Sequence, residues 1–237
     1  MYLDWYYVAL VLPAVIFSMI CSFMVNSTFK KYSKVISASG ITGADAAKKI
    51  LQSNGIYDVA IERVNGKLTD HFDPKAKVIR LSDSVYSSQS TAAIGVAAHE
   101  AGHAVQYAVQ YAPMKLRSAV VPFTNFSSNI GMLLIVVGIS LCYMGLKMQA
   151  IAYAGVILFS ACALFQLITL PTEFNASRRA LKALESTGIM SGTELNQSKK
   201  VLSAAAMTYI AALAVSIMTI LRFVMIIKNT NGKNNRG

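Results

Sequence analysis

The sequence is poor in charged residues: 14% of its 237 residues are Asp, Glu, Lys or Arg, whereas 54% are hydrophobic. That balance excludes an ordinary soluble domain and favours a membrane protein. Acidic residues are the scarcer sign, with 11 against 22 Lys and Arg. Most of these cations flank hydrophobic runs, so the expected partner of the positive charge is a lipid bilayer with an anionic surface, and no nucleic acid.

Cysteine is also scarce, and all three cysteines lie in apolar runs without CxxC spacing: Cys21, Cys142 and Cys162. This spacing excludes a disulfide framework and a cysteine metal cluster, and favours small buried hydrophobic residues. No internal repeat has the period of a solenoid or a propeller.

Long hydrophobic runs, by contrast, occur four times. Residues 5–25 carry no charge, and at about 1.5 Å per residue they are long enough to cross the bilayer. Lysines follow this run and none precedes it, which favours a retained anchor over a cleaved signal. Further spans are predicted at 130–146, 148–170 and 204–227. The only ionisable charge in them is Arg222, expected to snorkel to one end, and this scarcity argues against a transporter.

Two polar segments, 26–127 and 171–203, lie on one side of the membrane in this four-span topology. Their span ends carry more Lys and Arg than those of the other side, so the positive-inside rule places both segments in the cytoplasm. The Asn-rich tail, 228–237, is predicted to be disordered. We therefore expect a multi-pass protein of the cell membrane.

The segment 26–127 has the pattern of a small α+β domain. A helix is predicted at 44–55, closed by Gly55, and another from Ala92 to about Tyr111, capped by Ser90 or Thr91. Strands are predicted at 57–64 and 76–82, with Asn65-Gly66 as a hairpin turn between them. If the second strand has a free edge, an extended peptide could pair with residues 77–82.

The second of these helices contains the sequence HEAGH, residues 99–103. On a helix, His99 and His103 lie one turn apart and about 40° apart around the axis, so both imidazoles can reach one tetrahedral zinc ion. Glu100 is turned about 100° from His99, where a general base for a water molecule would stand. The alternative is a hydrogen-bonded polar patch in the core.

A catalytic zinc ion needs a third protein ligand. The candidates are His71, Glu173, Glu185 and Glu194. Glu173 is favoured because the hairpin of spans returns the chain to the side of His99, and Glu173 follows it by three residues. The alternative is an acid placed near the start of a new helix, where it favours the helix dipole.

The motifs VAAHEAGHAVQ, LTDHFDP, KVIRLSDSVY, LPTEFNASRRAL and AAAMTYIAAL, in this order, resemble the YugP-type family of bacterial membrane neutral zinc metallopeptidases. The chain is more distantly similar to the gluzincins of the HtpX and CAAX prenyl protease type. The resemblance implies a membrane α-helical protein with about four transmembrane helices and a small α+β zincin-like domain carrying the HExxH helix. It implies one Zn²⁺ per chain, bound by His99, His103 and Glu173, with Glu100 as catalytic base.

Gluzincins commonly have an Asp four residues after the ligand Glu, where it orients a histidine. Here that position is Ser177, so we expect Asn175 or Ser177 to supply the hydrogen bond. Candidates for substrate contact are His71, Arg178 and Tyr209. Each has an ordinary alternative, which is a turn residue, a lipid-facing cation and an interfacial tyrosine respectively.

The sequence thus predicts an integral membrane zinc-dependent metalloendopeptidase that hydrolyses protein or peptide substrates at or near the membrane. The alternative is a non-catalytic membrane scaffold or assembly factor with a structural zinc site. A fourth protein ligand, with His71 the candidate, would favour the scaffold. The substrate and the oligomeric state are left open by the sequence.

Overall fold

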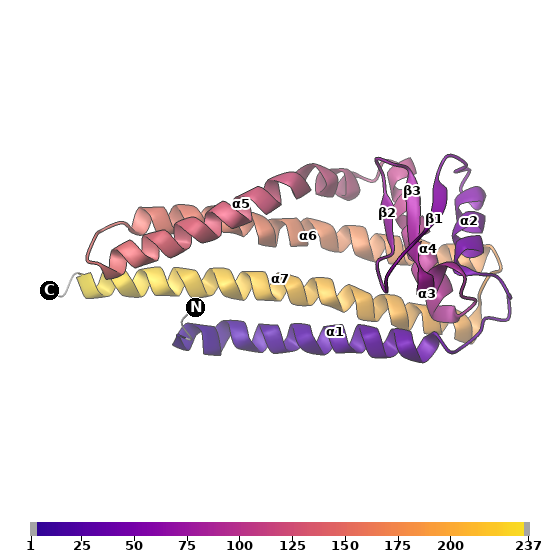
Figure 1. The fold of residues 1–237 in the computed structure, drawn as a ribbon, viewed down its shortest axis with the longest axis horizontal. Coiled ribbons are helices and arrows are strands. Elements are labelled where there is room, and N and C mark those ends of the chain that lie inside the picture. The colour runs from indigo at the N-terminus through magenta and orange to yellow at the C-terminus, as the bar shows by residue number, and fades with distance from the viewer. Residues whose placement is uncertain (1–3, 235–237) are drawn as a thin grey trace. The chain divides into compact units, whose positions relative to one another are not determined.

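The computed structural model describes residues 4–234, and their side chains except those of 122, 125 and 231–234. The chain is mostly helical, with one three-stranded sheet (Figure 1). Its contacts divide it into two units. The first unit consists of Met1–Ile20, Leu116–Leu170 and Thr208–Gly237, and the second of Cys21–Lys115 and Pro171–Met207.

Four helical segments are long and apolar enough to cross a membrane: Tyr7–Tyr32, Phe126–Tyr143, Gln149–Ser186 and Gly192–Thr230. The first is a π-helical turn, η1 (Tyr7–Val11), that continues as α1 (Leu12–Tyr32), and the others belong to α5 (Ala112–Tyr143), α6 (Gln149–Ser186) and α7 (Gly192–Asn234). These helices confirm the mostly helical fold with four candidate spans.

The helices run further than the hydropathy predicts. α6 continues through Pro171, so the predicted third span and the helix expected to start after it are one helix. Proline removes one helix hydrogen bond, but the helix continues on both sides of it. α7 extends to Asn234, so residues 228–234 are helical where the sequence predicts disorder, and 235–237 lie outside the described residues.

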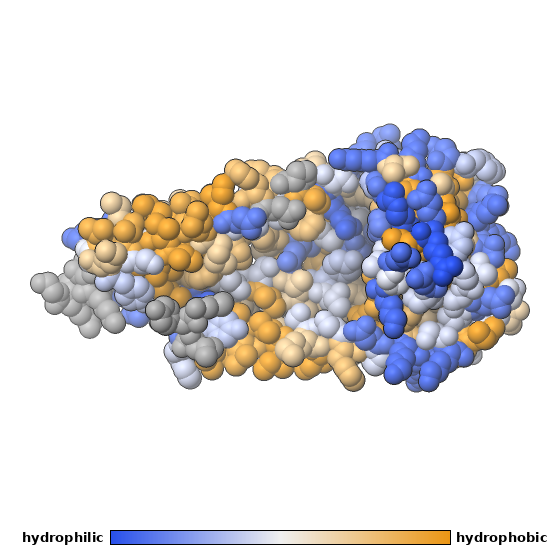
Figure 2. Space-filling view, in the orientation of Figure 1, coloured by the Kyte–Doolittle hydropathy of each residue, from blue (hydrophilic) through white to orange (hydrophobic). Residues whose placement is uncertain are grey.

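In the first unit, small residues bring α5 and α6 close together. A Cβ on Gly131 would lie 2.7 Å from the backbone N of Phe159, and one on Gly155 would lie 2.6 Å from that of Ile135. Close backbone approach at small residues is typical of membrane helix pairs. Figure 2 shows the apolar surface over α5 and α6 of this unit.

Arg222 is buried in the first unit, with 5% exposure. Its Nη2 and Nε lie 2.5 and 2.9 Å from Asp4 Oδ2, and the guanidinium stacks 5.2 Å from the centre of the Tyr7 ring. The prediction that Arg222 snorkels to solvent is therefore wrong. Asp4 precedes the first hydrophobic run, so the run itself gave no sign of this partner.

The sheet of the second unit has the order β1-β3-β2. β1 (Ala60–Val64) pairs in parallel with β3 (Val78–Ser82), and β2 (His71–Asp73) pairs antiparallel on the other side. The predicted hairpin through Asn65-Gly66 is wrong, because the chain after β1 crosses to β2 and the hairpin joins β2 to β3. Asp73 closes that turn by accepting hydrogen bonds from the N–H groups of Lys75 and Ala76.

Because β3 is the central strand, residues 77–82 have no free edge for an incoming peptide, and that prediction is also wrong. β2 was missed because three residues are too few to show an alternating pattern. Hydrophilic side chains gather over the strands and α2 on the face drawn in Figure 2.

The helices around the sheet begin and end much as their caps predict. α2 (Gly43–Ser53) opens with a capping box between Thr42 and Asp45, and Gly55 follows its end with φ of 72°. A short helix, α3 (Asp83–Tyr86), precedes α4 (Thr91–Ala108), where Ser90 Oγ accepts a hydrogen bond from the N–H of Ala93.

α4 is the central helix of the second unit, and most of its residues are buried. Its apolar side chains pack in one core with residues from α2, the sheet, α6 and α7: Ile50, Ile79, Leu81, Ile94, Leu184 and Leu202. A helix so enclosed holds its few polar side chains in fixed positions.

Candidate metal site

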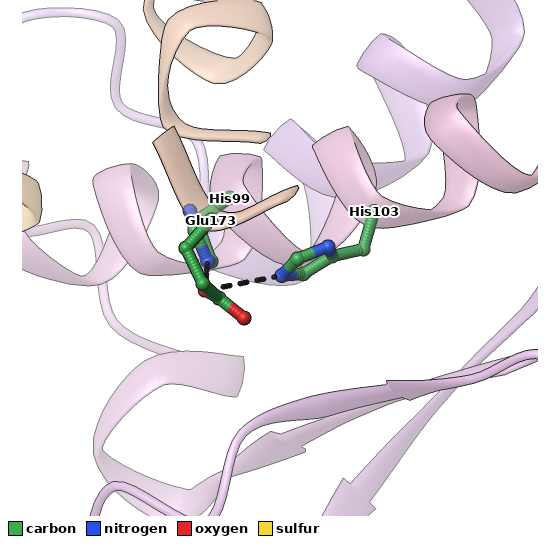
Figure 3. A group of neighbouring side chains, drawn as sticks. All are labelled: His99, His103 and Glu173. Atoms are coloured by element: carbon green, nitrogen blue, oxygen red, sulfur yellow. Dashed lines mark hydrogen bonds and ion pairs between the residues drawn. The ribbon is translucent and has the colours of Figure 1, made fainter. Parts of the chain in front are cut away.

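His99 and His103 on α4 face Glu173 on α6, and all three belong to the second unit (Figure 3). Glu173 Oε2 lies 3.2 Å from His99 Nε2 and 3.5 Å from His103 Nε2. One ligand atom from each of the three residues lies within 4.8 Å of the others, a group that could hold a metal ion. Glu173 and His103 are buried, at 2% and 7% exposure.

The two imidazoles are held by their other ring nitrogens. His99 Nδ1 lies 3.1 Å from Ser177 Oγ, and His103 Nδ1 lies 3.0 Å from Gln106 Oε1. Outer partners of this kind fix the ring orientation of histidines that bind metals. Of the two residues expected to form a hydrogen bond with a site histidine, Ser177 contacts His99 directly.

Gln106 fixes the tautomer of His103. Its Nε2 donates to the carbonyl of Thr172 at 2.8 Å and to Asn175 Oδ1 at 3.0 Å, so its Oε1 faces the imidazole as an acceptor. His103 Nδ1 must then carry a proton, and in the neutral ring Nε2 presents a lone pair towards Glu173. A buried carboxylate oxygen facing this lone pair suits a bound cation, and two nitrogens with one oxygen are a common donor set for zinc.

The electrostatics of the site favour positive charge. Burial by itself lowers the pKa of His103, but the hydrogen bond to Glu173 and the charges of Glu100 and Glu173 raise it by more. The net result is a pKa above the usual value of histidine. The carboxylates therefore create a potential that attracts a cation to the position between the imidazoles.

Gly102 sets the distance between the helices that carry the ligands. A Cβ at this position would lie 2.6 Å from the carbonyl oxygen of Ala176, one helical turn from Glu173. Only glycine permits α4 and α6 to approach so closely, because it has no side chain. This approach brings Glu173 within reach of both histidines.

Glu100 is buried, at 8% exposure, and lies close enough to His103 for its charge to raise the pKa of that imidazole. It is not in the three-residue group of candidate ligands. Among the described residues, no donor forms a hydrogen bond or ion pair with its carboxylate. The carboxylate therefore keeps its acceptor capacity for a water molecule or a substrate.

The remaining candidates from the sequence lie elsewhere. His71 is exposed on β2, where Nδ1 lies 2.8 Å from the carbonyl of Thr69 and Nε2 lies 3.4 Å from Arg80 Nη1, and it is not in the candidate metal group. Arg178 is exposed on α6. Tyr209 belongs to the first unit, and its role stays a prediction.

Asn175 acts on His103 through Gln106. Its Oδ1 accepts hydrogen bonds from Gln106 Nε2 and from Arg179 Nε, the latter at 2.8 Å. Gln106 is the functional residue that the sequence reasoning missed. The sequence held one signal for it: Gln106 is a polar residue one helical turn after His103, in a helix of mostly small apolar residues.

Comparison with known proteins places the chain in a family. Residues 7–228 match the model of a family described as "Putative neutral zinc metallopeptidase". The chain belongs to this family.

A relative from Bacillus subtilis (strain 168), described as "Putative membrane protease YugP", is 48% identical over 231 residues, which cover 96% of this chain and 99% of that protein. No solved structure matches the chain. The match confirms the resemblance inferred from the five motifs, and this family's zinc agrees with the donor set on α4 and α6.

Proposed function

We propose that the protein is an integral membrane zinc metalloendopeptidase of gluzincin type, with one Zn²⁺ held by His99, His103 and Glu173 in a zincin-like α+β domain. The observation that carries the proposal is the convergence of two imidazole Nε2 atoms on one carboxylate oxygen, at 3.2 and 3.5 Å. Both imidazoles are held from behind by hydrogen bonds, as expected for metal ligands.

Zinc bound there would lower the pKa of a water molecule and polarise the substrate carbonyl. Glu100 would accept a proton from the attacking water as its oxygen bonds to the peptide carbon. The same carboxyl group would then deliver that proton to the leaving nitrogen as the C–N bond breaks. Gln106 and Ser177 keep both imidazoles oriented throughout.

The enzyme is favoured over the non-catalytic scaffold by the number of ligands. A structural zinc site is closed by four protein ligands, whereas a catalytic site has three. Within residues 4–234, no fourth His, Cys, Asp or Glu joins the group, and His71 is engaged with Thr69 and Arg80. Glu100, beside the group, also has no role in a purely structural site.

The substrate class follows from the surroundings of the site in sequence. Glu173 belongs to a helix that is itself a candidate span, so membrane proteins and peptides near the membrane are the substrates we propose. The positive-inside rule places the site on the cytoplasmic face of the cell membrane. The description of the B. subtilis relative as a membrane protease supports this class.

The test compares Glu100→Gln and Glu173→Ala in the full chain purified in detergent, with Glu185→Ala as control because Glu185 is an exposed glutamate on the same helix as Glu173. Bound zinc is measured by atomic absorption, and hydrolysis with a quenched fluorescent protein substrate. We expect Glu100→Gln to keep its zinc and lose activity by at least about 100-fold, the usual effect of removing a general base.

Glu173→Ala should lose both zinc and activity, and the control should keep both. Full activity in Glu100→Gln would refute the catalytic role of that residue. Unchanged zinc affinity in Glu173→Ala would remove it from the ligand set.

A further inference from the structure

A groove of about 800 Å³ lies between α1 and α7 within the second unit. Residues that line it include Met24 and Lys31 from α1, and Lys199, Lys200, Ser203 and Met207 from α7. The metal site does not use any of these residues. The groove therefore needs an explanation of its own.

The groove is positive at one end and apolar at the other. On α1, Met24 precedes Lys31 by seven residues, and on α7, Met207 follows Lys200 by seven. At about 1.5 Å per residue, each interval is about 10 Å. α1 and α7 run in opposite directions (Figure 1), so the lysines of both helices meet at one end and the methionines at the other.

The lysines of the groove have no acidic partner among the described residues. No Asp or Glu lines the groove, and none forms an ion pair with Lys31, Lys199 or Lys200. The nearest acid along α7, Glu194, is occupied by hydrogen bonds from Ser37 Oγ at 2.7 Å and from the N–H of Ala38 at 2.8 Å. The positive charge of the groove is thus available to an anion.

We propose that this groove binds an anionic phospholipid, with the phosphate at the three lysines and an acyl chain along Met24, Ala204 and Met207. The two helices that form it are both candidate membrane spans, so lipids would surround them in the membrane. Basic pockets between membrane helices are typical sites for anionic lipid head groups. A soluble anion would match the lysines but not the methionine end.

The lipid site bears on the helix that carries the histidines. Thr91, the first residue of α4, contacts both helices of the groove: its Oγ1 lies 3.4 Å from the carbonyl oxygen of Tyr32, the last residue of α1, and 3.0 Å from Gln197 Oε1 on α7. Ser198 Oγ in turn donates to the carbonyl of Thr91 at 2.8 Å. A lipid that joins α1 to α7 therefore stabilises the start of α4, whether or not the protein is a peptidase.

The experiment measures the unfolding temperature of the full chain, stripped of lipid in detergent, against added phosphatidylglycerol, phosphatidylcholine or inorganic phosphate. The variant is Lys31→Gln with Lys199→Gln and Lys200→Gln. The matched control changes three exposed lysines outside the groove: Lys49, Lys67 and Lys75 to Gln. A second variant, Ser203→Trp, fills the groove at an exposed position and keeps every lysine.

For the wild type and the control, we expect phosphatidylglycerol to raise the unfolding temperature, with no comparable effect of phosphatidylcholine or phosphate. The triple variant should need at least roughly tenfold more phosphatidylglycerol for the same rise in unfolding temperature, since each Lys near an anionic lipid contributes to the binding free energy. Ser203→Trp should also weaken the response. Equal responses in the triple variant and the control would overturn the site, and an equal response to inorganic phosphate would overturn the lipid.

Discussion

Replacing Gly102 with alanine tests whether the close approach of α4 and α6 creates the metal site. The new Cβ would lie 2.6 Å from the carbonyl oxygen of Ala176, and 3.3 Å from its carbonyl carbon. Both atoms belong to the backbone of α6, so no side-chain rotation can relieve the clash. The two helices must move apart, and Glu173 moves away from His99 and His103 with α6.

The magnitude follows from two opposed effects. Alanine in place of a helical glycine contributes about 1 kcal/mol of helix stability. Overpacking a core against backbone costs typically about 1–3 kcal/mol. We therefore expect a net loss of up to about 2 kcal/mol in the free energy of unfolding of the metal-free protein. Zinc affinity should fall by at least about tenfold. Removing an outer partner of a metal ligand already costs about that much affinity, and displacing the ligand itself should cost no less.

Gly95→Ala is the matched control, because Gly95 lies on the same helix and its Cβ would meet Ser198 Cβ of α7 at 3.0 Å, a less severe contact and one with a helix that carries no candidate ligand. Both variants gain the same helix propensity, so their difference isolates the backbone clash. Zinc affinity is measured by competition with a chromophoric chelator, and stability by thermal unfolding followed by circular dichroism. If Gly102→Ala binds zinc as tightly as Gly95→Ala, the approach at Gly102 does not set the ligand geometry.

Two further predictions concern the hydrogen bond to His103 Nδ1 and the ion pair of Arg222. Gln106→Leu removes the acceptor of His103 Nδ1 and should weaken zinc binding by about 10–100-fold. Zinc affinity equal to that of the wild type would refute the orienting role. Asp4→Asn removes a carboxylate that pairs with the buried Arg222 and should destabilise the fold by up to about 3 kcal/mol. Zinc affinity should stay unchanged in this variant. The control is Asp58→Asn, which removes the exposed ion pair with Lys77 and should have little effect on the unfolding temperature.

Local patterns in the sequence predicted the parts of the fold that depend on neighbouring residues. The uncharged runs predicted four spans, and the Gly55 and Ser90 signals predicted the end of α2 and the start of α4. The pairing of strands depends on residues far apart in the chain. The turn signal at Asn65-Gly66 therefore gave the wrong hairpin, because the sheet places β1 beside β3 in parallel.

The candidate site shows the same division. The placement of His99 and His103 on one face follows from helical geometry and could be predicted. Glu173 could also be named as the favoured third ligand, because the chain returns to the same side of the membrane after two spans. The resemblance implied a hydrogen bond from Asn175 or Ser177, but the choice of Ser177 and the role of Gln106 could not be predicted, because they depend on which face of α6 meets α4. The continuation of the third span into the helix that carries Glu173 was not predicted, and Pro171 lies inside this one helix.

By itself, the sequence predicted four candidate membrane spans and a pair of histidines one turn apart on one helix, because hydrophobic length and helical periodicity are local properties of the chain. The tertiary structure alone decided that Glu173 reaches both histidines, that Gln106 fixes the tautomer of His103, and that Asp4 neutralises Arg222. Each of these contacts joins residues of different helices or depends on their close packing. Their distances follow from backbone approach at residues such as Gly102, which no local pattern encodes.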